Sequence, residues 1–341
     1  MEIYLVGGYV RDKLLGFDGS DRDFVVVNSS VEEMYRNNFV KVGKDFPVFI
    51  DQETREEYAL ARRDKKTGVG YKGFMFEIKD VKLEEDLYRR DLTINAMAMS
   101  GDGDLIDPYG GQSDLEKKIL RHVSNAFSED PLRVLRLARF KSRFYDFSIA
   151  PETVELVHEI RDSGELDTLT PERVYLEIEK SLKKGEIYLF FQTLQDLGVL
   201  KNIFPEVENF ESLKKVAMRS PIETVFALLP FELTKRLKTQ KKVLHFSEIY
   251  QGERDLKTAE GLHQFFNKIK SCKRLKELVY FLDLMGEYEK NELARLFILW
   301  KDLSKSFNFK SLEKGTDINK VFTAFRISEL KKNLDISNSL E

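Results

Sequence analysis

The spacing of hydrophobic and polar positions changes near residue 120. Before that point, short apolar runs separated by Gly, Asp and Asn occur at 3–6, 24–27, 46–50, 57–61 and 74–78. Runs of this length and composition are typical of β-strands. After it the apolar positions recur at helical spacing, and beyond Pro205 nearly all of the chain is Leu, Lys, Glu and Phe. The pattern predicts an α+β head (1–120), a helical neck (121–205) and a helical body and tail (206–341), with 206–220 as a candidate boundary.

Two helix starts can be placed from capping residues. Ser128 is followed by Glu129, Asp130 and Pro131, so we predict that a helix begins at Ser128 with acidic residues in its first turn. Thr170 is followed by Pro171, and proline is suited to the first position of a helix. The sequence therefore predicts a second helix that begins at Thr170.

Composition excludes several classes of protein. The 341 residues are 42% hydrophobic and 33% charged, and no apolar run approaches the roughly 18 residues that a membrane-spanning helix needs. The first residues enter a strand pattern at once and lack the features of a signal peptide, so we expect a cytoplasmic protein with no membrane partner. The one cysteine, Cys272, excludes an intramolecular disulfide and a cysteine-based zinc cluster.

Charge is distributed unevenly along the chain. Residues 1–120 hold 18 Lys and Arg against 24 Asp and Glu, whereas residues 121–341 hold 37 against 34. The acidic part suits cations, and basic groups in the tail suit a phosphate backbone. These basic groups are Lys235, Arg236, Lys238, Lys241, Lys242, Lys268, Lys270, Lys273, Arg274 and Lys276. By themselves, such basic groups are more often a solvated helix face.

A glycine pair follows the first predicted strand. In residues 6–12, Val-Gly-Gly-Tyr-Val-Arg-Asp, Gly7 and Gly8 stand between a strand and a helix, where a backbone without Cβ atoms can approach a phosphate closely. Arg11 would face the same anion. A Gly-Gly pair also occurs simply as a tight turn, so the pair alone leaves both interpretations open.

An Asp-x-Asp pair opens the next strand. The strand period of two places Asp21 and Asp23 on one face, and the apolar run 24–27 continues into the sheet. Two such oxygen ligands suit Mg²⁺ in phosphoryl transfer. Asp102 and Asp104 have the same spacing, but they lie in a Gly-flanked turn with no strand after them. Context therefore distinguishes the two pairs.

Five ordered motifs resemble those of class II tRNA CCA-adding enzymes and bacterial poly(A) polymerases. The first is Gly7 to Asp12 followed by Asp21-Arg22-Asp23, and the resemblance covers about 205 residues. The others are Arg-Arg-Asp-Leu-Thr-Ile-Asn-Ala at 89–96, Ile-Asp-Pro-Tyr-Gly-Gly at 106–111, Glu-Asp-Pro-Leu-Arg-Val-Leu-Arg-Leu-Ala-Arg-Phe at 129–140, and Thr-Pro-Glu-Arg-Val-Tyr-Leu-Glu at 170–177. The resemblance implies a polymerase β-type nucleotidyltransferase head.

The resemblance also implies roles for single residues. Asp21 and Asp23 would be the catalytic metal ligands, with Mg²⁺ as cofactor. Glu57 falls where the family places a third carboxylate that accepts the 3′-hydroxyl proton, although an exposed strand-edge glutamate is the alternative. The expected nucleotide-binding residues are Gly7, Gly8, Arg11, Arg90, Asp91, Asn95, Glu129, Asp130, Arg133, Arg136 and Arg139.

The fourth motif would select the base. On a helix, Asp130, Arg133 and Arg136 would share one broad face. A carboxylate accepts from an exocyclic amine and a guanidinium donates to ring acceptors, so Asp130 and Arg133 match cytosine or adenine but not guanine or uracil. Without the other motifs, the same residues would be interpreted as a surface ladder of ion pairs.

The resemblance implies template-independent addition of CCA to the 3′ end of tRNA from CTP and ATP, with no obligate protein partner. An A-adding enzyme, a poly(A) polymerase or a non-catalytic RNA-binding homologue are the alternatives. The Gly-rich and charged segment 62–74 is expected to be a mobile loop that helps the pocket change from CTP to ATP. Many relatives carry a phosphohydrolase domain marked by His-Asp, but the four histidines here precede Val, Glu, Phe and Gln. We therefore expect a compact form without that activity.

Overall fold

The computed structural model describes residues 1–17, 21–42, 48–66, 74–252, 255–270, 282, 286, 290–312 and 316–338. The chain divides into two compact units, Met1–Glu211 and Ser212–Glu341, which are described separately. The predicted basic residues Lys273, Arg274 and Lys276, and the centre of the predicted loop at 67–73, lie outside the described residues.

A seven-stranded mixed sheet forms the head, in the order β3-β4-β5-β2-β1-β8-β9. Its strands are β1 (Glu2–Val6), β2 (Asp23–Val27), β3 (Phe39–Val42), β4 (Val48–Asp51), β5 (Glu57–Leu60), β8 (Ala98–Met99) and β9 (Leu105–Ile106). The strand predicted at 46–50 thus begins at Val48, and residues 46–47 are outside the described ranges. A separate hairpin pairs β6 (Arg63–Lys66) with β7 (Phe74–Glu77).

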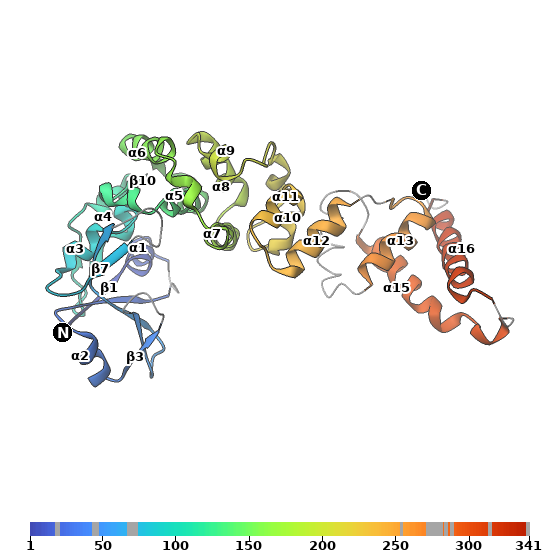
Figure 1. Cartoon of the computed structure of the whole chain (residues 1–341), viewed down its shortest axis with the longest axis horizontal. Helices are drawn as coiled ribbons and strands as arrows, with labels where there is room; N and C mark the ends of the chain where they lie inside the picture. The colour runs from blue at the N-terminus through green and yellow to red at the C-terminus, as the bar shows by residue number, and fades with distance from the viewer. Residues whose placement is uncertain are drawn as a thin grey trace. The chain divides into compact units, whose positions relative to one another are not determined.

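Both faces of the head sheet are buried, which explains its continuous apolar strands. In β2, Val25 and Val27 pack on one face with Val6 and Leu87, whereas Val26 packs on the other with Phe49. The helices of the head are α1 (Gly8–Leu14), α2 (Val31–Arg36), α3 (Leu83–Tyr88) and α4 (Gly111–Glu116) (Figure 1). Strand alternation places Asp23 on the face of Val25 and Val27.

The neck is mainly helical and packs around one central helix. Its elements are α5 (Leu132–Arg143), β11 (Ser148–Ile149), α6 (Pro151–Asp162), α7 (Pro171–Lys184), α8 (Ile187–Asp196) and α9 (Leu200–Ile203), and β11 pairs with β10 (Ile119–Leu120) at the end of the head. Helix α5 packs against α7 and α8 (Figure 1). Gly185, which follows α7, permits a close approach to α5, because a Cβ atom there would lie 2.6 Å from Ser142 Oγ.

One predicted helix start is confirmed and the other is wrong. Thr170 is the N-cap of α7 and Pro171 is its first residue, as predicted. Ser128, however, lies inside a 3-10 helix (Asn125–Glu129) that is capped by Ser124, and α5 begins only at Leu132. The reason is Pro131, because the residue before a proline is driven away from helical geometry. Asp130 is accordingly extended, with φ −119° and ψ 103°.

The second unit is a bundle of helices. They are α10 (Ile222–Leu228), α11 (Phe231–Arg236), α12 (Lys241–Gln251), α13 (Ala259–Ile269), α15 (Lys290–Ser306) and α16 (Ile318–Asn338). Its core includes Phe246, Phe266 and Trp300. The buried indole of Trp300 donates to His263 Nδ1 over 3.0 Å, so its one polar atom is satisfied inside the core. No described helix of either unit is long and apolar enough to cross a membrane.

Candidate active site

The glycine pair forms a turn that admits two guanidinium groups. Gly7 has φ +68°, a conformation that favours glycine, and a Cβ atom there would lie 3.0 Å from Arg90 Nη1. A Cβ atom on Gly8 would lie 3.5 Å from Arg11 Nη2. The turn follows β1, whose last residue, Val6, is the register partner of Asp23. The two glycines thus bring Arg11 and Arg90 to the strand end that carries Asp23.

Three carboxylates gather at this strand end. Asp23 and Glu57 are direct register partners on the parallel strands β2 and β5, so their side chains point to the same face. Burial by surrounding protein raises the pKa of Asp23, and the negative charges of Glu57 and Asp21 raise it further, while Arg90 opposes the shift. Neighbouring carboxylates repel one another, and their combined negative charge attracts a cation. The oxygen donors fit a hard divalent ion.

A cavity of about 460 Å³ opens beside Asp23. This volume lies within the range of small-molecule sites, roughly 300–1,000 Å³. Cationic side chains dominate its wall, which favours an anionic ligand. The lining residues are Gly7, Gly8, Arg11, Asp23, Arg89, Arg90, Asp91, Asn95, Asp130, Leu132, Arg133, Arg136, Arg139, Phe140, Arg143, Arg173 and Lys184.

Most of the residues predicted for the site therefore lie together. Asp21, Glu57 and Glu129 do not line the cavity: the first two lie at the strand ends beside it, and Glu129 ends the 3-10 helix before Asp130. Sequence reasoning missed Arg89, Arg143, Arg173 and Lys184 as lining residues. Arg143 could have been found from helical spacing. It lies seven residues, or about two turns, after Arg136 and therefore on the same face of the helix.

Asp91 ties the head to α5. Its Oδ2 accepts from Arg136 Nε over 2.7 Å, and its Oδ1 accepts from the Asn95 amide over 3.0 Å and from Leu92 N over 2.8 Å. Burial alone would raise the pKa of Asp91, but Arg136 and these hydrogen bonds hold it well below its usual range. Asp91 therefore lies at the cavity as a charged residue that fixes Arg136.

We expect Asp91→Asn to destabilise the first unit by about 1–3 kcal/mol at neutral pH, because it removes the charge-assisted hydrogen bonds to the Arg136 guanidinium. Since the folded-state pKa of Asp91 is depressed, the stabilisation is complete well above the unfolded-state pKa of about 4 and is lost as pH falls. Chemical denaturation of both proteins between pH 7 and pH 3 measures the difference. A stability gap that stays constant with pH would contradict this account.

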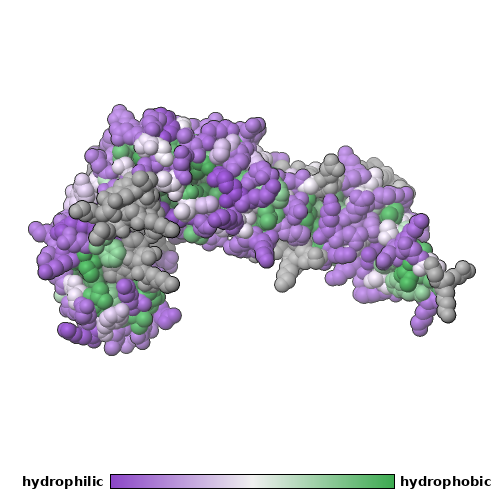
Figure 2. Space-filling model, viewed as in Figure 1, coloured by the Kyte–Doolittle hydropathy of each residue, from purple (hydrophilic) through white to green (hydrophobic). Residues whose placement is uncertain are grey.

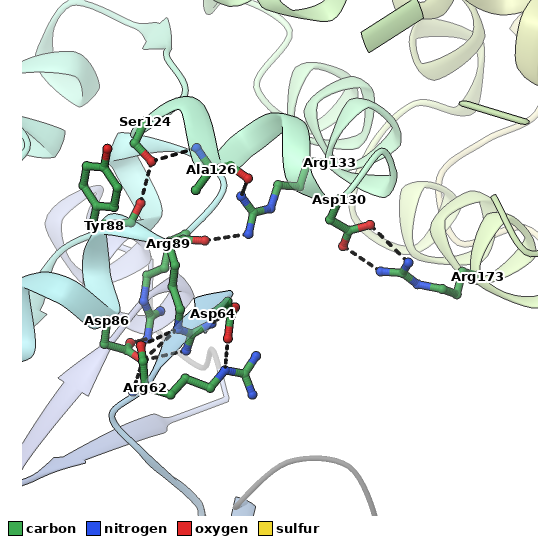
Figure 3. Close-up of polar contacts among 11 residues, drawn as sticks. Arg62, Asp64, Asp86, Tyr88, Arg89, Ser124, Ala126, Asp130, Arg133 and Arg173 are labelled. Carbon is green, nitrogen blue, oxygen red and sulfur yellow. Dashed lines mark hydrogen bonds and ion pairs between the residues drawn. The ribbon is translucent and has the colours of Figure 1, made fainter. Parts of the chain in front are cut away.

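The base-selecting residues are held differently from the prediction. Because Asp130 precedes the helix, it does not share a face of α5 with Arg133 and Arg136, and that prediction was wrong. Its carboxylate instead accepts from the Leu132 N–H and from both terminal nitrogens of Arg173, at 3.1 and 2.7 Å (Figure 3). A bidentate guanidinium fixes the plane of the carboxylate. Arg173 comes from α7, so a second helix orients Asp130.

Arg133 is anchored by backbone carbonyls. It donates through Nη1 to Ala126 O and through Nη2 to Arg89 O, each over 2.6 Å (Figure 3). These bonds use two of the five N–H donors of a guanidinium. Arg139, six residues further along α5, donates to buried Glu177 of α7 over 2.6 Å. The arginines of α5 are thus each fixed by the head or by α7.

Arg89 also connects to the base of the β6–β7 hairpin. Its guanidinium donates to buried Asp86 and to the carbonyl of Arg62, and it lies 3.5 Å from Asp64 (Figure 3). Arg62 in turn pairs with Asp64 over 2.9 Å. Since Arg133 donates to the carbonyl of Arg89, the described start of the predicted loop is linked through Arg89 to Arg133, a predicted base-selecting residue.

Comparison with known proteins assigns the family. Residues 3–121 match the model of the poly A polymerase head domain, and residues 146–211 match the model described as the probable RNA and SrmB-binding site of polymerase A. The Multifunctional CCA protein of Acinetobacter baumannii (strain SDF) is 58% identical over 211 residues, which are 61% of this chain and 51% of that protein.

Two parts of the chain, residues 3–121 and 146–211, therefore belong to the poly A polymerase family. The chain spans about half the length of the curated relatives that it matches.

Solved structures of this family share the fold. The Bacillus stearothermophilus CCA-adding enzyme in complex with CTP is 22% identical with a TM-score of 0.69, covering 97% of this chain and 89% of that one. The Thermotoga maritima CCA-adding enzyme complexed with tRNA is 22% identical with a TM-score of 0.66, covering 100% and 92%. The predicted fold class, a nucleotidyltransferase head with helical domains, is confirmed.

Proposed function

We propose that this chain adds CMP and AMP, from CTP and ATP, to the 3′ end of tRNA. The observation that carries the proposal is the pairing of Asp23 with Glu57 at the mouth of an arginine-lined cavity. In the reaction, the tRNA 3′-oxygen forms a bond to the α-phosphorus as the bond to the bridging β-phosphate oxygen breaks, and pyrophosphate leaves. Enzymes of this kind act with their tRNA substrates in the cytoplasm.

The family is generally dependent on divalent metal, and we propose Mg²⁺ with Asp21 and Asp23 as its protein ligands. Two carboxylates suit Mg²⁺, which commonly takes one or two carboxylates and completes its coordination with phosphate oxygens and water. When bound, the ion neutralises triphosphate charge and favours ionisation of the attacking hydroxyl.

The protein itself supplies a base, positioning and charge. Glu57 would accept the 3′-hydroxyl proton, and its position opposite Asp23 on the neighbouring strand supports this role. Arg11 and Arg90, beside the glycine turn, would hold the phosphates. Because Arg11 is already paired with Asp12 and Arg90 with Asp86, these two guanidiniums need little rearrangement when a nucleotide binds.

Base choice would rest on Asp130 and Arg133. The carboxylate of Asp130 accepts from the exocyclic amine of cytosine or adenine, and Arg133 donates to a ring acceptor. Arg173 and the carbonyls of Ala126 and Arg89 hold the two groups in place. Arg89 donates to the carbonyl of Arg62 at the base of the hairpin and accepts from Arg133 through its own carbonyl. A movement of the hairpin could therefore shift Arg133 when the enzyme changes from CTP to ATP.

The second unit would bind tRNA. Lys235, Arg236, Lys238, Lys241 and Lys242 are exposed on and between α11 and α12. Figure 2 shows that the visible face of this unit carries mainly hydrophilic side chains. Exposed cations that follow a phosphate backbone release counterions and so give salt-dependent binding.

We expect the five substitutions Lys→Gln and Arg→Gln at these positions to weaken tRNA binding and to reduce its salt dependence, while the KM for CTP changes little. Filter binding between 50 and 200 mM salt measures the tRNA affinity and its salt dependence. Each lost phosphate contact lowers the slope of log affinity against log salt concentration by about 0.9 or less. An unchanged slope would assign these residues to an ordinary solvated face.

A stepwise assay tests the proposed function. Purified protein receives tRNA without its terminal CCA and CTP alone, and separately tRNA ending in CC and ATP alone. A third reaction offers ATP alone to tRNA without its terminal CCA. We expect two cytidines in the first reaction and one adenosine in the second. Activity with ATP alone on every substrate would indicate a poly(A) polymerase, activity only in the second reaction an A-adding enzyme, and binding without extension a non-catalytic homologue.

A further inference from the structure

A buried aspartate joins two arginines that come from different parts of the first unit. Asp12, in α1, is 1% exposed. Its Oδ1 accepts from Arg11 Nε over 2.8 Å and from Arg11 Nη2 over 2.7 Å. Arg143, at the end of α5, reaches the same oxygen through Nη2 over 3.1 Å. One carboxylate oxygen therefore holds a guanidinium from the head and another from the neck.

Both of these arginines line the cavity. Arg11 Nη1 also donates to Asn95 Oδ1 over 2.6 Å. The two guanidinium carbons lie 5.4 and 4.9 Å from the ring centre of Phe144, which places both charges against one aromatic side chain. Two cations against one buried anion leave a net positive charge at this part of the cavity wall. Such a surplus favours an anionic ligand.

The location of the pair indicates which part of a nucleotide it would contact. Arg11 lies over Gly8, in the turn that follows Val6, and Val6 is the register partner of Asp23. The pair thus lies at the carboxylate side of the cavity, where the phosphates must be for reaction. Asp130 and Arg133 lie at another part of the lining and are held by α7 and by backbone carbonyls.

We propose that Asp12 is a positioning residue for the triphosphate, because it holds Arg11 and Arg143 side by side as one anion-binding pair. The inference rests on the proposed function and deepens it, since it names the residue that sets the phosphate contacts. Asp12 does not touch the nucleotide. Its carboxylate offsets the repulsion between the guanidiniums and fixes their direction, so the effect applies equally to CTP and ATP.

The test uses the full chain with Asp12→Asn, which keeps the size of the side chain and removes its charge. Loss of charge-assisted hydrogen bonds of this kind weakens binding by about tenfold or more. We expect the KM for CTP and for ATP to rise by about that factor. The dissociation constant of inorganic triphosphate, measured by calorimetry without tRNA, should rise by the same factor, while the preference between C and A stays unchanged.

The chain offers a matched control in Asp162→Asn. Asp162 also follows an arginine, and Arg161 Nε donates to it over 2.7 Å, but this pair is exposed at the end of α6. The control should leave KM and triphosphate binding unchanged. A merely structural role for Asp12 would lower thermal stability and the active fraction with KM and triphosphate affinity unaltered, and that result overturns the proposal.

A second variant keeps the proposal testable if Asp12→Asn does not fold. Arg143→Gln removes the neck member of the pair, and it should raise the same KM values and the same triphosphate dissociation constant. Unchanged values in Arg143→Gln would overturn the proposal. If instead the wild-type protein binds inorganic triphosphate but extends no tRNA, the proposed function fails while the binding measurement still decides the role of Asp12.

Discussion

Asp23→Ala is expected to abolish the addition of both nucleotides, with the rate reduced by more than about 100-fold, and Asp21→Ala is expected to do the same. Both carboxylates lie at the strand end where Glu57 and the glycine turn meet, and the chemistry there is common to every step. Because neither residue belongs to the second unit, tRNA affinity should remain within a few-fold. Single-turnover extension with CTP and with ATP, together with filter binding, measures these effects.

Asp102→Ala is the matched control. Asp102 and Asp104 repeat the Asp-x-Asp spacing, but they lie exposed in the turn between β8 and β9, where Gly103 has φ +92°. Activity of this variant should equal that of the wild-type protein. Retention of more than a few per cent of activity in both Asp21→Ala and Asp23→Ala would remove these residues from the metal site.

The second large effect concerns base choice, and we expect Arg133→Ala to lower discrimination against UTP and GTP by about ten- to a hundred-fold. A bidentate polar contact to a base is worth about 1–3 kcal/mol of discrimination, so its loss has this magnitude. Asp130→Ala should act in the same direction. Values of kcat/KM for all four nucleotides, on tRNA lacking CCA and on tRNA ending in CC, measure the effect.

Arg173→Ala tests how far selectivity depends on the orientation of Asp130 rather than on its contact with the base. It removes the bidentate partner of Asp130 but leaves both base-selecting side chains in place. We expect it to have a smaller effect on selectivity than Asp130→Ala. A uniform fall in kcat/KM for all four nucleotides in Asp130→Ala and Arg133→Ala, with their ratios unchanged, would show that base choice lies elsewhere.

The parts of the site that follow local periodicity could be predicted from the sequence. Strand alternation placed Asp23 on the face of Val25 and Val27, but Asp21 lies two residues before β2, so the strand period does not apply to it. The Gly-Gly pair indicated close approach at the end of β1. The position of Glu57 depended on the parallel pairing of β5 with β2, which joins segments more than thirty residues apart. Only the family resemblance pointed to that pairing.

The errors also have physical causes. The capping pattern mispredicts the geometry at Asp130, because Pro131 prevents the residue before it from adopting helical geometry. Arg173 and Lys184 reach the cavity only because α7 packs against α5. The role of Asp12 depends on Arg143, a residue more than 130 positions away. No local pattern contains information about such tertiary contacts.

The most direct test of the central claim is the sequence of the product. tRNA that lacks its terminal CCA is incubated with the protein, Mg²⁺ and all four nucleotides, and the extended 3′ ends are sequenced. A single cavity that selects cytosine and then adenine predicts the addition of C, C and A in that order, followed by termination. Products that carry only adenosines, or a mixture of all four nucleotides, would contradict the account.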